Sequence, residues 1–194
     1  MGLRKLVEGV GVNDVFDVST WVEVGGRRVK CPYYRVWRDM LKRCYSSCYH
    51  KRQPTYKNCE VCDEWKVFSN FKGWMMNQDW ENKHLDKDLL KEGNKIYCPD
   101  YCIFVNQTLN KFTHEKTITT ENMRGVNWHK AAGKYHARCN NPFTGVRESL
   151  GFYHDSYEGH LAWKTRKHEL ACMLADSELV SDPRLAEALR TRYL

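Results

Sequence analysis

Twice along this sequence, a group of short strand-like segments is followed directly by a helix-like segment. The first such region spans residues 84–112 and the second spans residues 124–175. Strands that are grouped before a helix, instead of alternating with helices one by one, favour an α+β fold over a doubly wound parallel sheet. We therefore predict an α+β protein in which each region forms a small sheet packed on its own helix.

The composition fits a folded protein that does not enter a membrane. The chain has 194 residues, of which 42% are hydrophobic, enough to bury a core without disulfide bonds. Its apolar runs are short, such as Cys102-Ile103-Phe104-Val105, whereas a bilayer-spanning helix needs about 20 apolar residues. The N-terminus also lacks the pattern of a signal peptide. We expect a cytoplasmic protein with no membrane partner.

Positive charge is concentrated in one stretch. Between Gly26 and Asn58 there are ten Lys or Arg residues and one acid, Asp39, in a chain of formal net charge +7. Tyrosine and tryptophan interleave with these cations, as they do on surfaces that bind nucleic acid. The alternative is a solvated basic face with no partner.

A helix is predicted to begin at Pro32, and it carries several of these positively charged residues. Its apolar residues recur with helical spacing and form one stripe: Tyr33, Val36, Trp37, Met40, Leu41 and Cys44. The cations are displaced from this stripe and are predicted to face outward, as a DNA-binding surface: Arg35, Arg38, Lys42 and Arg43.

The region 84–112 carries the candidate chemistry. On a strand that begins at His84, alternation places His84, Asp86 and Asp88 on one face, and the helix after the second strand can bring Asn110 back across it. Carboxylate and amide oxygens form a site suited to Mg²⁺ or Mn²⁺. Spacing alone leaves open that these are ordinary exposed polar residues.

This region resembles the ββα-metal core of phage-type HNH endonucleases. The resemblance rests on Leu85-Asp86-Lys87-Asp88, on the segment Tyr97 to Val105, and on Asn110, and similar upstream segments extend it over about residues 9–112. It implies that Asp86 and Asn110 hold one divalent metal. It also implies hydrolysis of DNA phosphodiester bonds, in the manner of a phage homing enzyme.

Two positions depart from the family pattern. Lys87 stands where the family has the histidine that takes a proton from the attacking water, and a lysine is a poor base unless it is strongly desolvated. Nearby candidates for the base are His84 and Tyr97, while Lys87 is predicted to clamp the scissile phosphate. Cys102 replaces an asparagine that braces the family's core.

The cysteines permit a structural zinc site. Nine cysteines in a chain without a signal peptide favour reduced thiols or a metal over a disulfide scaffold. Cys59-x-x-Cys62 is half of a zinc knuckle, and we predict that Cys44 and Cys102 complete it. The alternative is a set of buried free thiols.

The region 124–170 resembles the Apetala-type DNA-binding domain of plants. The resemblance rests on Arg124-Gly125-Val126-x-Trp128, Gly133-Lys134-Tyr135, Leu150-Gly151-Phe152 and the following helix. It implies a three-stranded sheet that lies in the major groove of double-stranded DNA, with a helix behind it. Alternation predicts an inner face formed by Val126, Trp128, Tyr135, Ala137, Leu150 and Phe152. The outer, DNA-binding face is predicted to carry Asn127, His129, Lys134, His136, Arg138 and Arg147.

The predicted organisation has four parts. They are a nuclease domain with an N-terminal extension at 1–112, a linker at 113–123, an Apetala-type domain at 124–175 and a C-terminal helix at 176–194, which Asp182 caps. A single metal site cuts one strand, so a double-strand break requires a homodimer or two successive nicks. The alternative function is a DNA-binding protein that retains the nuclease fold without cutting.

Overall fold

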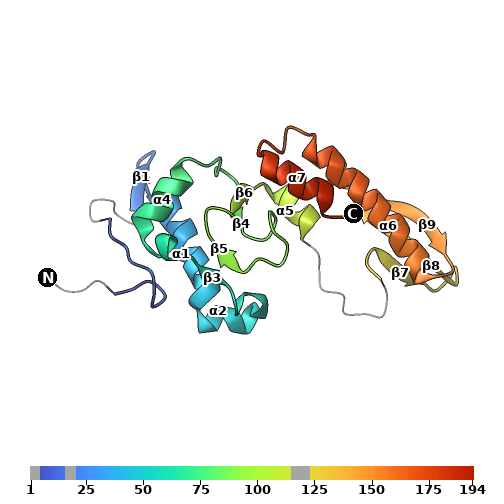
Figure 1. Cartoon of the computed structure of the whole chain (residues 1–194), viewed down its shortest axis with the longest axis horizontal. Coiled ribbons are helices and arrows are strands. Elements are labelled where there is room, and N and C mark those ends of the chain that lie inside the picture. The colour runs from blue at the N-terminus through green and yellow to red at the C-terminus, as the bar shows by residue number, and fades with distance from the viewer. Residues whose placement is uncertain (1–4, 16–20, 115–122) are drawn as a thin grey trace. The chain divides into compact units, whose positions relative to one another are not determined.

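The computed structural model describes residues 5–15, 21–114 and 123–194, and its architecture is mixed α and β (Figure 1). The α+β prediction is confirmed at this level. Its contacts divide the chain into two compact units, Met1–Val105 and Asn106–Leu194. None of the helices in the described residues is long and apolar enough to cross a membrane.

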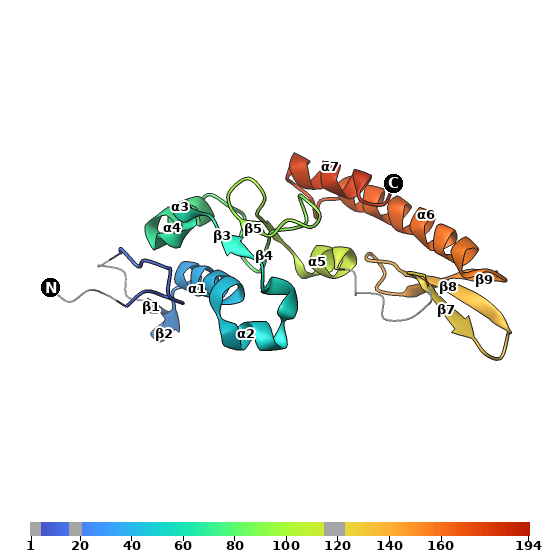
Figure 2. The same cartoon turned by 60° about the horizontal axis from the view of Figure 1, so that its bottom comes forward.

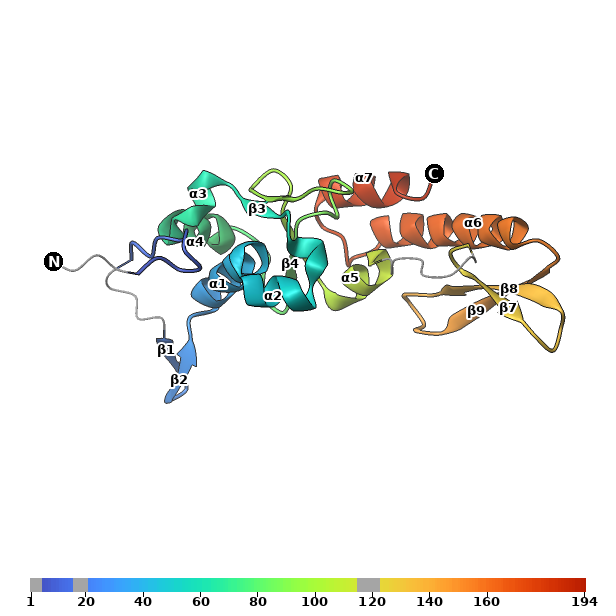
Figure 3. The ribbon, with the colours of Figure 1, turned by 90° about the horizontal axis from the view of Figure 1, so that it is seen from below.

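The first unit combines short helices with three two-stranded sheets. Its helices are α1 (Pro32–Tyr45), α2 (Ser47–Arg52), the 3₁₀ turn η1 (Pro54–Tyr56), α3 (Asp63–Lys66) and α4 (Phe68–Met76). Its strands are β1 (Trp21–Val24), β2 (Arg27–Lys30), β3 (Glu60–Val61), β4 (His84–Asp86), β5 (Ile96–Tyr97) and β6 (Ile103–Val105). The pairs β1–β2 and β4–β6 are antiparallel, and β3–β5 is parallel. Figure 3 shows the β1–β2 hairpin extending away from the helices of this unit.

The core of the first unit forms around α1, as its apolar stripe predicts. Trp37, Met40, Leu41 and Cys44 are all buried, and they pack with the aromatic residues of α3 and α4. Trp37 also donates its indole N–H to the backbone carbonyl of Trp65 at 2.7 Å. Replacing such a buried tryptophan by alanine typically costs about 3–5 kcal/mol.

The N-terminal segment is held against this core. A Cβ atom on Gly11 would lie 2.4 Å from the Leu41 side chain, so the backbone there approaches α1 more closely than any other residue type permits. The Asp14 carboxylate accepts hydrogen bonds from the N–H and hydroxyl of Ser69 in the first turn of α4. These contacts hold in place the segment around Gly11 and Asp14, for which the sequence pattern predicts neither a helix nor a strand.

The second unit consists of one three-stranded antiparallel sheet and three helices. The strands, in the order β7-β8-β9, are β7 (Val126–His129), β8 (Lys134–Asn140) and β9 (Arg147–Tyr153), and the helices are α5 (Gln107–Thr113), α6 (Ser156–Ala175) and α7 (Pro183–Thr191). Figures 2 and 3 show α6 running along one face of the sheet. Asp182 caps α7 as predicted, by accepting the N–H of Arg184 at 2.8 Å.

The boundary between the units differs from the prediction. It falls at Val105/Asn106, not after residue 112, so α5 belongs with the sheet of the second unit. The reason is a buried contact: Lys167 of α6 donates a hydrogen bond to the carbonyl of Phe112 at 2.6 Å, and the Phe112 ring meets Tyr193. The C-terminal helix also belongs to this unit, because Leu185 and Leu189 are buried. Most of the predicted linker, residues 115–122, lies outside the described residues.

Candidate functional site

The end of β4 fixes the position of Asp86. Strand β4 pairs with β6, with Asp86 opposite Ile103, and the chain turns immediately afterwards. The turn forms because Asp86 Oδ1 accepts two backbone N–H groups, from Asp88 at 3.0 Å and from Leu89 at 2.8 Å. The strand therefore ends before Asp88, which lies beside Asp86 because of the turn and not because of strand alternation.

Asp86 and Asp88 form a pair of neighbouring carboxyl groups. Burial raises the pKa of Asp86, and the negative charge of Asp88 raises it further, against the two backbone N–H donors, which lower it. Two carboxylates in one place repel each other, and a divalent cation relieves that repulsion. These hard oxygen donors fit Mg²⁺ or Mn²⁺ in kind. Among the residues that the structure describes, no three His, Cys, Asp or Glu side chains are grouped to hold a metal ion.

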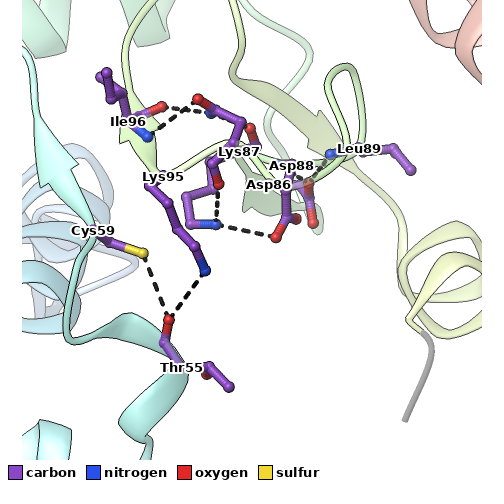
Figure 4. A network of polar contacts seen from close by, with 9 residues as sticks. Thr55, Cys59, Asp86, Lys87, Asp88, Leu89, Lys95 and Ile96 are labelled. Carbon is purple, nitrogen blue, oxygen red and sulfur yellow. Dashed lines mark hydrogen bonds and ion pairs between the residues drawn. The ribbon is translucent and has the colours of Figure 1, made fainter. Parts of the chain in front are cut away.

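Lys87 is 5% exposed, and its side chain connects one member of this carboxyl pair to the neighbouring loop. Its ammonium donates hydrogen bonds to Asp88 Oδ2 at 3.0 Å and to the carbonyl of Asn94 at 2.9 Å (Figure 4). The rings of Tyr56 and Tyr97 lie about 6 Å away, at 5.9 and 6.0 Å. The ammonium therefore joins the β4 turn to the loop before β5.

This environment corrects the predicted role of Lys87. Burial lowers its pKa, but the carboxylate of Asp88 outweighs that effect and the pKa lies above its ordinary value. Lys87 is therefore a buried, protonated group whose donors are engaged within the protein. It is not placed to clamp a phosphate, and as a cation it is not a base.

Tyr97 is also excluded as the general base. It lies on β5, which pairs with β3, and not on the strand that pairs with β4. The side chain is 1% exposed, and burial raises its pKa. The positive charge of Arg43 on α1 lies close to it. A phenol buried in the core in this way is not placed to take a proton from a water molecule.

His84 and Asn110 are the remaining predicted site residues. His84 is exposed and lies two residues before Asp86 on β4, so both share the face opposite the buried Leu85. Asn110 is half-buried on α5, whose N-terminus is capped by Asn106. Asn110 belongs to the second unit and Asp86 to the first, and the two are linked through the chain: β6 ends at Val105 and α5 begins two residues later.

The four predicted zinc ligands do not form one group. Cys44 lies near Cys59, whereas Cys102 lies near Cys62 and near Cys98. Burial raises the pKa of each predicted thiol, to about 12 for Cys44. Protonated thiols packed in the core match the alternative of buried free cysteines.

The cations of α1 do not all face outward. Arg35 is exposed, Lys42 is half-buried, and Arg38 pairs with the neighbouring Asp39 at 2.8 Å. Arg43 is half-buried and close to the Tyr56 and Tyr97 side chains. A long side chain beside an apolar stripe can point to either side of it, so the predicted outward direction does not hold equally for all four cations.

The outer face of the β7–β9 sheet carries most of its predicted residues. Asn127 pairs with His136, and His129 pairs with Lys134, across β7 and β8. Arg138 and Arg147 lie at the other end of this face, and the buried Nε atom of Arg138 has no hydrogen-bond partner among the described residues. The face therefore presents donors and positive charge.

The predicted inner face is wrong for β9. The register shifts between Ala137, which pairs with Gly151, and Arg138, which pairs with Ser149, so Leu150 is an extra residue in a β-bulge. The bulge reverses the alternation, and Phe152 lies on the outer face, 46% exposed. Sequence reasoning missed the signal for this, which is Gly151, an isolated glycine within a strand pattern.

Trp128 is a second exception to the predicted inner face. It is 51% exposed and contacts the ring of Tyr135 at 4.9 Å between centroids, whereas Val126 and Ala137 are buried beneath α6 as predicted. The inner face is therefore covered only where the helix reaches it.

The described geometry thus consists of an acidic turn in the first unit and a cationic sheet face in the second. Comparison of the chain with protein-family models, with curated proteins and with solved structures gave no match.

Proposed function

We propose that this chain is a divalent-metal-dependent DNA endonuclease of the HNH class, whose second unit binds double-stranded DNA. One observation carries the proposal: the antiparallel β4–β6 pair leads directly into α5, and Asp86 lies at the end of β4 beside a second carboxylate. This strand-strand-helix order, with an acid on the first strand, is the arrangement that the HNH resemblance implies.

The residues have distinct roles in this proposal. Asp86 and Asp88 would supply oxygen ligands, and the bound cation would polarise the phosphodiester and neutralise charge on the leaving oxygen. His84 takes the proton from the attacking water, because it is the exposed base on the same face of β4 as Asp86.

The sheet face supports DNA as the partner. Arg138 and Arg147 supply positive charge, while Asn127 and the two histidines supply hydrogen-bonding groups. Each phosphate contact that is lost should reduce the salt dependence of binding by about one counterion. We therefore expect Arg147→Ala to weaken binding and to flatten its dependence on salt.

The proposal is tested by incubating the whole protein with supercoiled plasmid and Mg²⁺ or Mn²⁺, and following nicking on a gel. Wild type should nick the plasmid, and the activity should disappear with a chelator. It should also be lost in Asp86→Asn and fall at least tenfold in His84→Ala. Asp100→Asn is a matched control, because Asp100 is an exposed acid outside the site. Undiminished cleavage by Asp86→Asn would show that the site is elsewhere.

The alternative function is a DNA-binding protein that does not cut. The burial of Lys87 favours it, because the residue at the family's general-base position is unavailable for catalysis. In that case the plasmid stays intact with every metal, while a mobility shift still shows binding that Arg147→Ala weakens.

A further inference from the structure

An aromatic cluster lies in the middle of the cationic sheet face. It consists of Phe152 on β9, His136 on β8 and His129 on β7. Phe152 and His136 stack with their centroids 4.4 Å apart and their planes at 17°, and His129 meets Phe152 at 5.2 Å and 81°. The His136 ring is further fixed by a 2.8 Å hydrogen bond to the hydroxyl of Ser149. The three strands thus present one ordered group of rings to solvent.

The backbone is specifically arranged to place Phe152 there. Gly151 has φ +114°, a conformation that side chains rarely adopt, and it follows the bulge residue Leu150. Without this bulge, alternation would turn Phe152 towards α6 and the core. The chain instead exposes a large apolar ring, at 46%, on a face that is otherwise polar.

Charge around the cluster indicates the class of partner. Lys134 pairs with His129, and Arg138 and Arg147 lie farther along the same face, close enough to His136 for their charges to lower its pKa. This part of the face therefore carries positive charge. A ligand that fits it must be anionic and must also offer an apolar group at its centre.

Double-stranded DNA offers one such group in the major groove, the C5 methyl of thymine. Stacking on an unpaired base fits less well, because His136 already covers one face of the Phe152 ring. An apolar contact with a methyl group needs only the remaining exposed surface of the ring.

Resting on the proposed function, we propose that Phe152 is a specificity-determining residue that reads thymine by contact with its C5 methyl group. His129 and His136 hold the ring in place for this contact. The expected effect is about a fourfold loss of affinity for each contacted methyl that is removed, the value for burying one such group.

The experiment begins with selection of DNA by the whole protein from a random-sequence duplex pool. A selected duplex is then made again with deoxyuridine in place of each conserved thymidine, which removes only the methyl group. Wild type should bind the thymidine duplex about fourfold more tightly than the deoxyuridine duplex. In Phe152→Ala this ratio should fall to one, and in Phe152→Leu, which keeps an apolar side chain, it should lie between.

Tyr157→Ala is the matched control. Tyr157 is an aromatic residue that is 53% exposed on α6, which covers the other face of the sheet, so this variant should keep the fourfold ratio. The proposal is overturned if Phe152→Ala discriminates thymidine from deoxyuridine as wild type does, or if wild type does not discriminate. Binding that depends on Arg147 but not on the methyl groups would refute this inference alone. If no duplex is retained, the proposed function fails as well.

Discussion

Lys167 allows a quantitative test of how the second unit holds α5. The residue is 7% exposed on α6, and its ammonium donates to the carbonyl of Phe112 in the last turn of α5. It also lies 3.4 Å from the centroid of the Phe112 ring and 5.4 Å from that of Tyr193. A single buried cation thus connects α6, the end of α5 and the turn that follows α7.

The burial of this charge has a calculable cost. Desolvation is the main reason that the pKa of Lys167 falls from 10.5 to about 8. The positive charge of Arg192 lowers the pKa further, while Cys139 raises it. At about 1.4 kcal/mol for each tenfold change in proton affinity, the charged form destabilises the folded state by about 3 kcal/mol. The unfolded chain binds this proton more tightly, so the full cost applies below pH 8. It is relieved as the pH rises from about 8 to about 10.5.

Lys167→Met tests this reasoning, because methionine fills a similar volume without a charge. At pH 7 the variant loses one hydrogen bond, worth about 1 kcal/mol, but escapes the cost of the charge, so it should be about 2 kcal/mol more stable than wild type. At pH 10.5 the wild-type lysine is largely neutral. The difference in unfolding free energy between the two proteins should therefore shift by about 3 kcal/mol in favour of wild type.

The assay is urea unfolding of both proteins at pH 7 and pH 10.5, followed by circular dichroism. The transition of the second unit is identified as the one that Leu189→Ala displaces, since Leu189 is a fully buried residue of α7. All other titrating groups are common to both proteins and cancel in the difference. Lys164→Met, a less buried position on the same helix, should show no such shift. A difference that stays constant between the two pH values would refute the argument.

Two further predictions concern stability. Gly125→Ala should destabilise the second unit by more than about 3 kcal/mol, because Gly125 has φ +79° and a Cβ atom there would lie 2.0 Å from the Trp163 ring. Thermal unfolding checks this, with Gly133→Ala as the control that has positive φ but open space and should cost only about 1 kcal/mol. Lys87→Met should lower the stability of the first unit by about 1–3 kcal/mol, because the carbonyl of Asn94 loses its donor. Plasmid nicking by the folded fraction should remain at the wild-type level. A loss of nicking without a loss of stability would show that Lys87 takes part in catalysis.

Periodic segments were predictable from the sequence. The stripe from Trp37 to Cys44 predicted α1 and its buried side, and alternation with glycine turns predicted the three strands of the second unit. The pattern at 84–112 likewise predicted β4, β6 and α5 in order. Each of these features depends on residues a few positions apart, and the spacing of apolar groups reports them directly.

Pairing between distant segments was not predictable. Strand β3 pairs in parallel with β5 across more than thirty residues, and its two-residue strands carry no periodic pattern. That pairing places Tyr97 in the core, where it is 1% exposed, and this burial removes it from the role of general base that the sequence suggested. The single-residue bulge at Leu150 had an equally large effect on which ring faces solvent.

The sequence by itself therefore determined the longer helices, such as α1 and α6, and the main strands, because local spacing decides them. Only the tertiary structure decided which charges are buried and which are exposed. Lysine is usually a surface residue. Yet Lys87 and Lys167 are buried, and each ammonium donates to a backbone carbonyl of another segment, that of Asn94 and that of Phe112. The physical reason is that a long cationic side chain is stable inside a protein only where partners from elsewhere in the chain surround its charge, and no local pattern encodes their position.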